Sequence, residues 1–75
     1  MNLLAQINEQ DFDSNASIPL GFLFASVKNV GGQTATVNGV ALSPGEAKSY
    51  PFVGKAYQAV PFEPNGSTLR ILYIL

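Results

Sequence analysis

The chain has 75 residues, no cysteine, no histidine and a formal net charge of −1 at pH 7. We therefore expect one small domain. Disulfides and metal sites with thiolate or imidazole ligands cannot stabilise it, so oligomerisation remains as the additional source of stability. Hydrophobic residues make up 47% of the chain and charged residues only 12%, about half the usual charged share of roughly 25%. Such a surface is poorly protected against association, and its four scattered basic residues argue against a nucleic-acid partner.

The N-terminal residues MNLLAQINEQ have no basic region and too short an apolar run for a signal peptide. No stretch of the chain approaches the ~20 apolar residues that span a bilayer, so we expect no membrane partner and synthesis in the cytoplasm. The segment NLLAQIN is predicted to be a strand with Leu3, Ala5 and Ile7 on one face. The next segment, NEQDFDSNASIP, is rich in acidic residues and ends on proline, which predicts a loop.

From residue 20 onward, apolar residues recur with a period of two, which is typical of strands. LGFLFASVKNV is predicted to be a long strand that is apolar on both faces. Shorter strands are expected in QTATVNGV, VAL, EAKSYPFV and KAYQAVPFE, separated by turns at Gly31-Gly32, Asn38-Gly39 and Pro44-Gly45. The segment PNGS is expected to be a hairpin turn, and Pro51 and Pro61 place their strands at sheet edges or mark bulges.

The final segment, TLRILYIL, is apolar on both faces of its predicted strand. Leu69, Ile71, Tyr73 and Leu75 point one way, while Leu72 and Ile74 point the other way with Arg70. An antiparallel strand with one face in water does not have this pattern. The strand is therefore either central and covered on both faces, or it meets another subunit.

These elements predict an all-β protein: a single antiparallel β-sandwich or small barrel of six to seven short strands that spans residues 1–75. Residues 1–19 would form an N-terminal strand or arm and an acidic loop, and residues 20–75 the sandwich core.

No combination of residues is adequate for catalysis, because histidine is absent and no nucleophile lies beside a base. Pairs such as Ser26 and Lys28 are ordinary solvent-facing neighbours in a sheet. We therefore expect no enzyme and no cofactor. Asp11, Asp13 and Asn15 alternate as at the start of an EF-hand loop, but the sixth and twelfth positions, Ala16 and Phe22, are not ligands. An exposed acidic loop explains this segment better than a calcium site.

Two tyrosines leave a second function open. Tyr50 and Tyr57 could form a stacking surface for a sugar, together with the loop from Asp11 to Asn15, in a carbohydrate- or ligand-binding module. Tyrosines with buried rings and solvated hydroxyl groups explain the same pattern.

The run VKNVGGQTATVNGVALSPGEAKSYPF, Val27 to Phe52, contains Asn-x-Gly, a Thr/Val strand and Leu-x-Pro-Gly-Glu. It resembles the immunoglobulin-like modules of bacterial adhesion and surface proteins. It is also similar to the small β-structured accessory proteins of tailed-phage virions, of the head-decoration, head-fibre and tail-associated types. A free-standing domain without a signal peptide favours the second group. That resemblance implies a structural virion component that binds a capsid or tail lattice.

Such a protein would associate with itself, as a trimer, through its last strand and the exposed face of LGFLFASV. The interface residues expected on that strand are Leu69, Ile71, Leu72, Tyr73, Ile74 and Leu75. The N-terminal residues Leu3, Leu4 and Ile7 are expected to contact the capsid or tail lattice.

Overall fold

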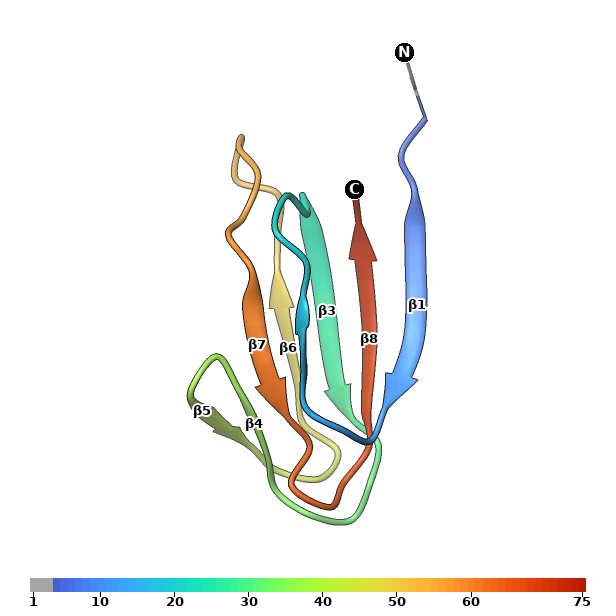
Figure 1. Ribbon diagram of the computed structural model, residues 1–75, viewed down its shortest axis with the longest axis vertical. Helices are drawn as coiled ribbons and strands as arrows, with labels where there is room; N and C mark the ends of the chain where they lie inside the picture. Colours follow the sequence, from blue (N-terminus) through green and yellow to red (C-terminus); the bar gives the residue numbers. More distant parts are fainter. Residues whose placement is uncertain (1–3) are drawn as a thin grey trace.

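The computed structural model describes residues 4–75, which fold into eight β-strands without a helix. The strands are β1 (Ile7–Phe12), β2 (Ala16–Ile18), β3 (Phe24–Asn29), β4 (Ala35–Val37), β5 (Val40–Leu42), β6 (Ala47–Tyr50), β7 (Val60–Glu63) and β8 (Leu69–Ile74). They form two four-stranded sheets, ordered β1-β8-β3-β6 and β2-β7-β4-β5 (Figure 1). Every strand pair is antiparallel. The predicted all-β antiparallel fold is confirmed, as a small β-sandwich.

The strand count is eight because the acidic N-terminal segment, expected to be a loop, supplies both β1 and β2. β1 has the sequence INEQDF and lies at the edge of its sheet, where only β8 pairs with it. Most of its side chains are therefore exposed, and polar residues are tolerated on both of its faces. Its polarity, which suggested a loop, reflects this edge position.

The strand predicted from Leu20 begins only at Phe24. The preceding residues 20–23 instead cross one end of the sandwich, with Gly21 at a φ of 101°. Leu20 and Phe22 consequently do not share a strand face with Phe24: Phe22 is fully buried, whereas Leu20 is exposed.

The turns follow the predicted positions with one exception. Asn38 and Gly39 have φ values of 52° and 78° and close a two-residue hairpin between β4 and β5. The segment PNGS does turn the chain, with Ser67 N–H donating to the Pro64 carbonyl at 3.0 Å. However, it carries the chain from β7 in one sheet to β8 in the other, so it is not a hairpin.

The two prolines occupy different positions from those expected. Pro51 lies one residue beyond β6. Pro61 lies in β7, which is an inner strand between β2 and β4, so the prediction of an edge strand is wrong. β7 tolerates the missing N–H because β4 pairs only with Phe62 and Glu63 and stops short of Pro61.

The core lies between the two sheets and draws on both of them. Sheet β1-β8-β3-β6 contributes Ala25, Val27, Leu69 and Ile71; the other sheet contributes Ile18, Ala35, Val37, Leu42, Val60 and Phe62; and Phe22 enters from the loop before β3. At roughly 25 cal/mol per Å² of buried apolar surface, these side chains supply most of the driving force for folding.

Candidate interaction surface

Four segments meet at the end of the sandwich where β1 begins and β8 finishes. Backbone hydrogen bonds join Gln6 to Leu75 in both directions, at 3.3 and 3.0 Å, and Leu23 N–H to the Ile74 carbonyl at 2.7 Å. Gly21 N–H donates to the Tyr57 carbonyl and Tyr57 N–H to the Phe22 carbonyl, both at 2.9 Å. Residues 4–7, 19–24, 51–59 and 73–75 therefore form one surface, at the top of Figure 1, which we call the apolar end.

The apolar end holds most of the exposed hydrophobic side chains of the described residues. Six of the eight large exposed ones belong to it: Leu4, Ile7, Leu20, Phe52, Val53 and Leu75. Single exposed hydrophobic residues need no explanation, whereas a group of this size gathered at one end is typical of interaction sites.

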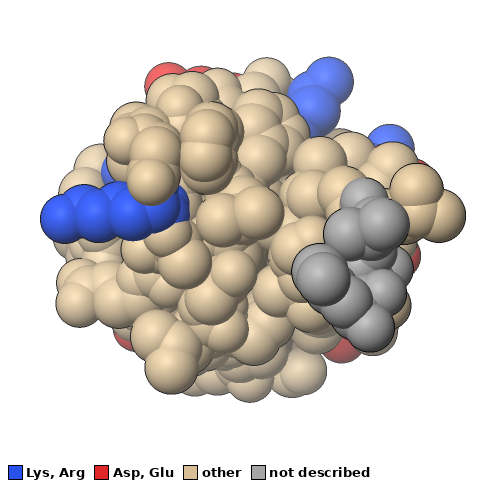
Figure 2. Space-filling model, turned by 90° about the horizontal axis from the view of Figure 1, so that it is seen from above, with Lys and Arg blue, Asp and Glu red and all other residues tan. Residues whose placement is uncertain are grey.

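Charge is nearly absent from the same surface. Lys55 is the only charged residue in the four segments. Figure 2 views the molecule from this end; outside the grey area it shows mostly uncharged side chains, with lysine, arginine and acidic atoms toward the margins. A partner of the apolar end would therefore need to match hydrophobic surface rather than charge.

The apolar surface continues onto the outer face of sheet β1-β8-β3-β6. Ile7, Ile74 and Phe24 lie opposite one another on neighbouring strands and form an apolar row beside the apolar end. In the next row Leu72 lies between Glu9 and Ser26, and the third row is charged, with Asp11 opposite Arg70. The outer face of the sheet thus changes from apolar to charged along the strands.

The structure corrects part of the predicted oligomer interface. β8 is an inner strand between β1 and β3. Leu69 and Ile71 are 0% and 1% exposed because their side chains lie in the core of the single chain, so they are not available to a second subunit. Tyr73 is half-buried against the same core. Leu72 and Ile74, on the other face, are partly exposed, and Leu75 is exposed.

The predicted lattice contacts lie beside the predicted oligomer contacts. Ile7 is directly opposite Ile74, and Leu4 precedes the residue pair Gln6–Leu75. Leu3 lies outside the described residues. Two surfaces that the sequence suggested for different partners therefore form one continuous surface.

Phe52 and Val53, two exposed residues of the apolar end, were missed in the sequence, and Leu20, although part of the segment LGFLFASV, was expected in a strand and not in an exposed loop. Leu20 was assigned to a strand face, and Phe52 and Val53 were read as the end of another strand. The signal that could have found them is the neighbouring glycine. Gly21 and Gly54 both have positive φ, at 101° and 93°, which marks turns rather than strands.

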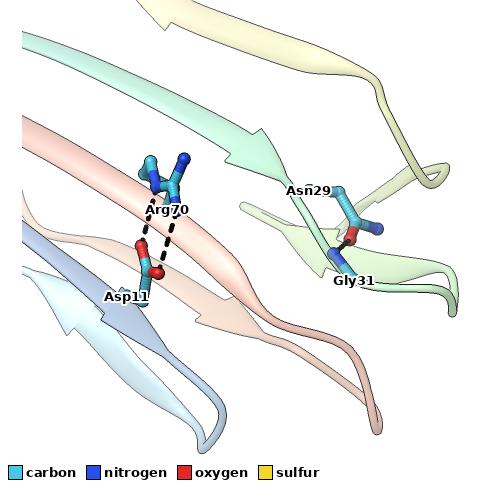
Figure 3. A network of polar contacts seen from close by, with 4 residues as sticks. All are labelled: Asp11, Asn29, Gly31 and Arg70. Atoms are coloured by element: carbon cyan, nitrogen blue, oxygen red, sulfur yellow. Dashed lines mark hydrogen bonds and ion pairs between the residues drawn. The ribbon is translucent and has the colours of Figure 1, made fainter.

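Asp11, the first residue of the suggested calcium segment, is held by Arg70. The Arg70 Nε and Nη2 atoms donate to its two carboxylate oxygens at 2.9 and 3.2 Å (Figure 3). This hydrogen bonding lowers the pKa of Asp11 and raises that of Arg70. The pKa of Glu46 is also lowered, because its carboxylate accepts the Ser43 backbone N–H at 2.6 Å. Among the described residues, no group of three potential metal ligands converges.

The rings of Tyr50 and Tyr57 pack against one another and against Phe22. Tyr57 stacks on Phe22 with ring centroids 4.8 Å apart, and Tyr50 meets both rings edge to face. The Tyr57 hydroxyl donates to the Pro51 carbonyl at 2.6 Å, whereas the buried Tyr50 hydroxyl has no partner. Both rings pack against the core, and no pocket opens among the described residues.

Comparison with known proteins identifies no relative: no family model, no curated protein and no solved structure matches the chain. The described residues contain no helix that is long and apolar enough to cross a membrane.

Proposed function

We propose that this protein is a non-enzymatic structural protein that associates with itself, as a trimer, and serves as an accessory component of a tailed-phage virion bound to a capsid or tail lattice. The observation that carries the self-association is the continuous, nearly uncharged apolar surface formed by the apolar end and the row Ile7, Ile74 and Phe24. The virion role is supported by the resemblance of Val27 to Phe52 to small phage accessory proteins.

Physical considerations favour association over a solitary domain. A chain of 75 residues has a small core and no cysteine, and association supplies the burial that such a domain lacks. Binding that requires the folded state also stabilises that state by mass action. Within β8, Leu72 and Ile74 remain as the interface candidates once Leu69 and Ile71 are assigned to the core.

The self-association is tested by the solution mass of the purified protein, measured by light scattering after gel filtration across a hundredfold range of concentration. We expect a trimer for the wild type and a lower mass for Leu72→Glu, which places a charge on the outer face of β8. The matched control is Ala41→Glu, an exposed position in the other sheet, which should keep the wild-type mass. A wild type that stays monomeric throughout the range would contradict self-association.

The virion role requires a separate measurement. Particles purified from a host culture that carries the gene should contain this chain, detected by mass spectrometry in a fixed ratio to the major capsid or tail protein. A protein that is expressed in the lysate but absent from washed particles would contradict the virion role without affecting the self-association.

A further inference from the structure

The exposed side chains of the apolar end are presented by loops that are fixed in place. The loop carrying Leu20 is joined to the loop carrying Phe52 and Val53 through Tyr57, whose backbone bonds to Gly21 and Phe22 and whose hydroxyl bonds to the Pro51 carbonyl. The stacked rings of Tyr57 and Phe22 lie beneath these loops. The chain therefore rigidly holds side chains that are 75%, 63% and 61% exposed, and preorganised surfaces of this kind favour binding.

The area of this surface is adequate for a stable protein interface. The exposed fractions of Leu4, Ile7, Leu20, Phe52, Val53 and Leu75 amount to about four fully exposed side chains, or on the order of 700 Å². The largest patch on a typical monomer is roughly 300–600 Å². Each partner in a standard interface contributes about 800 Å², and the mostly buried Ile74 and Phe24 beside these residues add a smaller exposed area.

The charge pattern indicates which partner fits. When copies of one protein associate through one surface, every charged group on that surface is taken from water in every copy and needs an opposite charge beside it. The four segments of the apolar end carry no acidic residue and only one basic residue, Lys55, so copies can meet there without opposed charges. The third row of the outer face contains the charged residues Asp11 and Arg70, so copies could not meet there without burying charges.

We propose that the apolar end is the surface on which copies of this chain meet, with Leu20, Phe52 and Val53 at the contact beside Ile7 and Leu75. This inference rests on the proposed self-association and assigns it to a defined surface that includes two loops outside β8. In the resulting assembly the apolar ends lie together, so Leu4 and Ile7 would contact other copies instead of the lattice, and a lattice contact would fall to the opposite ends of the sandwiches, which point outward.

The test compares charge substitutions at three positions that are exposed and outside the core. Leu20→Glu and Phe52→Glu lie in the apolar end, and Val40→Glu, at a position that is 54% exposed in the β4–β5 hairpin, is the matched control. All three should retain the wild-type circular dichroism spectrum, since the positions are exposed. By light scattering, we expect the apparent dissociation constant to rise at least tenfold for Leu20→Glu and Phe52→Glu and to stay unchanged for Val40→Glu.

The other outcomes are distinct. A wild-type oligomer that persists in Leu20→Glu and Phe52→Glu but is lost in Leu72→Glu would overturn this inference and leave the self-association standing. A monomeric wild type would overturn both. In that case, pelleting with phosphatidylcholine and phosphatidylserine vesicles that is lost in Phe52→Glu would show that a lipid surface covers the apolar end instead of another copy.

Discussion

The two ends of this sandwich differ in how the loops that connect the strands are stabilised. At each end the chain must turn between sheets and satisfy the backbone groups that the strands leave unpaired. The end opposite the apolar end, which we call the turn end, contains residues 30–34, 43–46 and 64–68. It closes itself with a buried network of polar contacts, whereas the apolar end leaves large hydrophobic side chains in water.

Asn29 is the centre of the turn end. Its side chain is fully buried, and its amide nitrogen donates to the carbonyls of Gln33 at 2.7 Å and Leu42 at 2.8 Å. Its amide oxygen accepts from Gly31 N–H at 3.1 Å, a contact shown in Figure 3, and from the Ser67 hydroxyl at 2.5 Å. An asparagine side chain offers two donors and an acceptor with two lone pairs, and all of these are used here.

Among its described residues, the apolar end has no buried network of side-chain hydrogen bonds of this kind. The hydroxyl of Tyr50, which packs beneath the apolar end, lacks a partner, and most of the large hydrophobic residues of the apolar end are exposed. The contrast teaches that the turn end is completed by the chain's own side chains, whereas the apolar end keeps exposed hydrophobic surface, which in our proposal other copies cover. We accordingly expect substitutions at the turn end to change the free energy of unfolding more than substitutions at the apolar end.

The largest effect is expected at Asn29. Asn29→Ala removes the partner of the buried Leu42 carbonyl and the buried Ser67 hydroxyl, and of the part-buried Gln33 carbonyl and Gly31 N–H. Each buried group left unsatisfied costs about 1–3 kcal/mol. Since some of these groups can relax toward solvent, we expect the free energy of unfolding to fall by ~3 kcal/mol or more, measured by urea denaturation. Asn8→Ala, at a half-buried position on β1, is the control and should change stability by less than about 0.5 kcal/mol. Equal losses of stability in Asn29→Ala and Asn8→Ala would contradict the view that the hydrogen bonds of Asn29 stabilise the turn end.

The next effect is expected at Gly31 and sharpens the same comparison. A methyl group at Gly31 would come within 2.5 Å of the Thr68 backbone nitrogen and would also collide with the Ser67 side chain. Gly31→Ala should therefore destabilise the protein by roughly 2–3 kcal/mol, because the clash involves backbone that cannot move freely. The neighbouring Gly32 has no atom within 4 Å of its added methyl group and no positive φ, so Gly32→Ala is expected to be neutral or slightly stabilising. Thermal unfolding followed by circular dichroism distinguishes the two variants.

Much of the fold was predictable because the periodicity of the chain and its turn residues act locally. The Asn38-Gly39 turn and the strand at the end of the chain were found where the sequence placed them. The acidic strand β1 was missed because an edge strand has little buried surface, so its side chains carry no alternation to detect.

The candidate surface was less predictable, because it depends on how the two sheets pack. Ile71 and Leu72 are adjacent in sequence, yet only the pairing of β8 between β1 and β3 shows that one is core and the other is on the outer face. Likewise, Leu20 and Phe52 are 32 positions apart in the sequence, and the bonds of Tyr57 to both loops bring them to one end.

The smallest effect is expected at Tyr57, in the apolar end, and at Tyr50, which packs against it, because the two tyrosines differ in the hydrogen bonding of their hydroxyl groups. Tyr57→Phe removes the hydrogen bond to the Pro51 carbonyl and should lower the free energy of unfolding by about 0.5–1.5 kcal/mol. Tyr50→Phe removes a buried hydroxyl that has no partner, so stability should stay unchanged or rise by up to ~1 kcal/mol. Both variants keep the ring contacts with Phe22, so urea denaturation measured on the pair isolates the hydroxyl groups. A loss of stability in Tyr50→Phe that matches that in Tyr57→Phe would mean that the Tyr50 hydroxyl is hydrogen-bonded in solution, and that the apolar end is more completely satisfied than its exposed side chains imply.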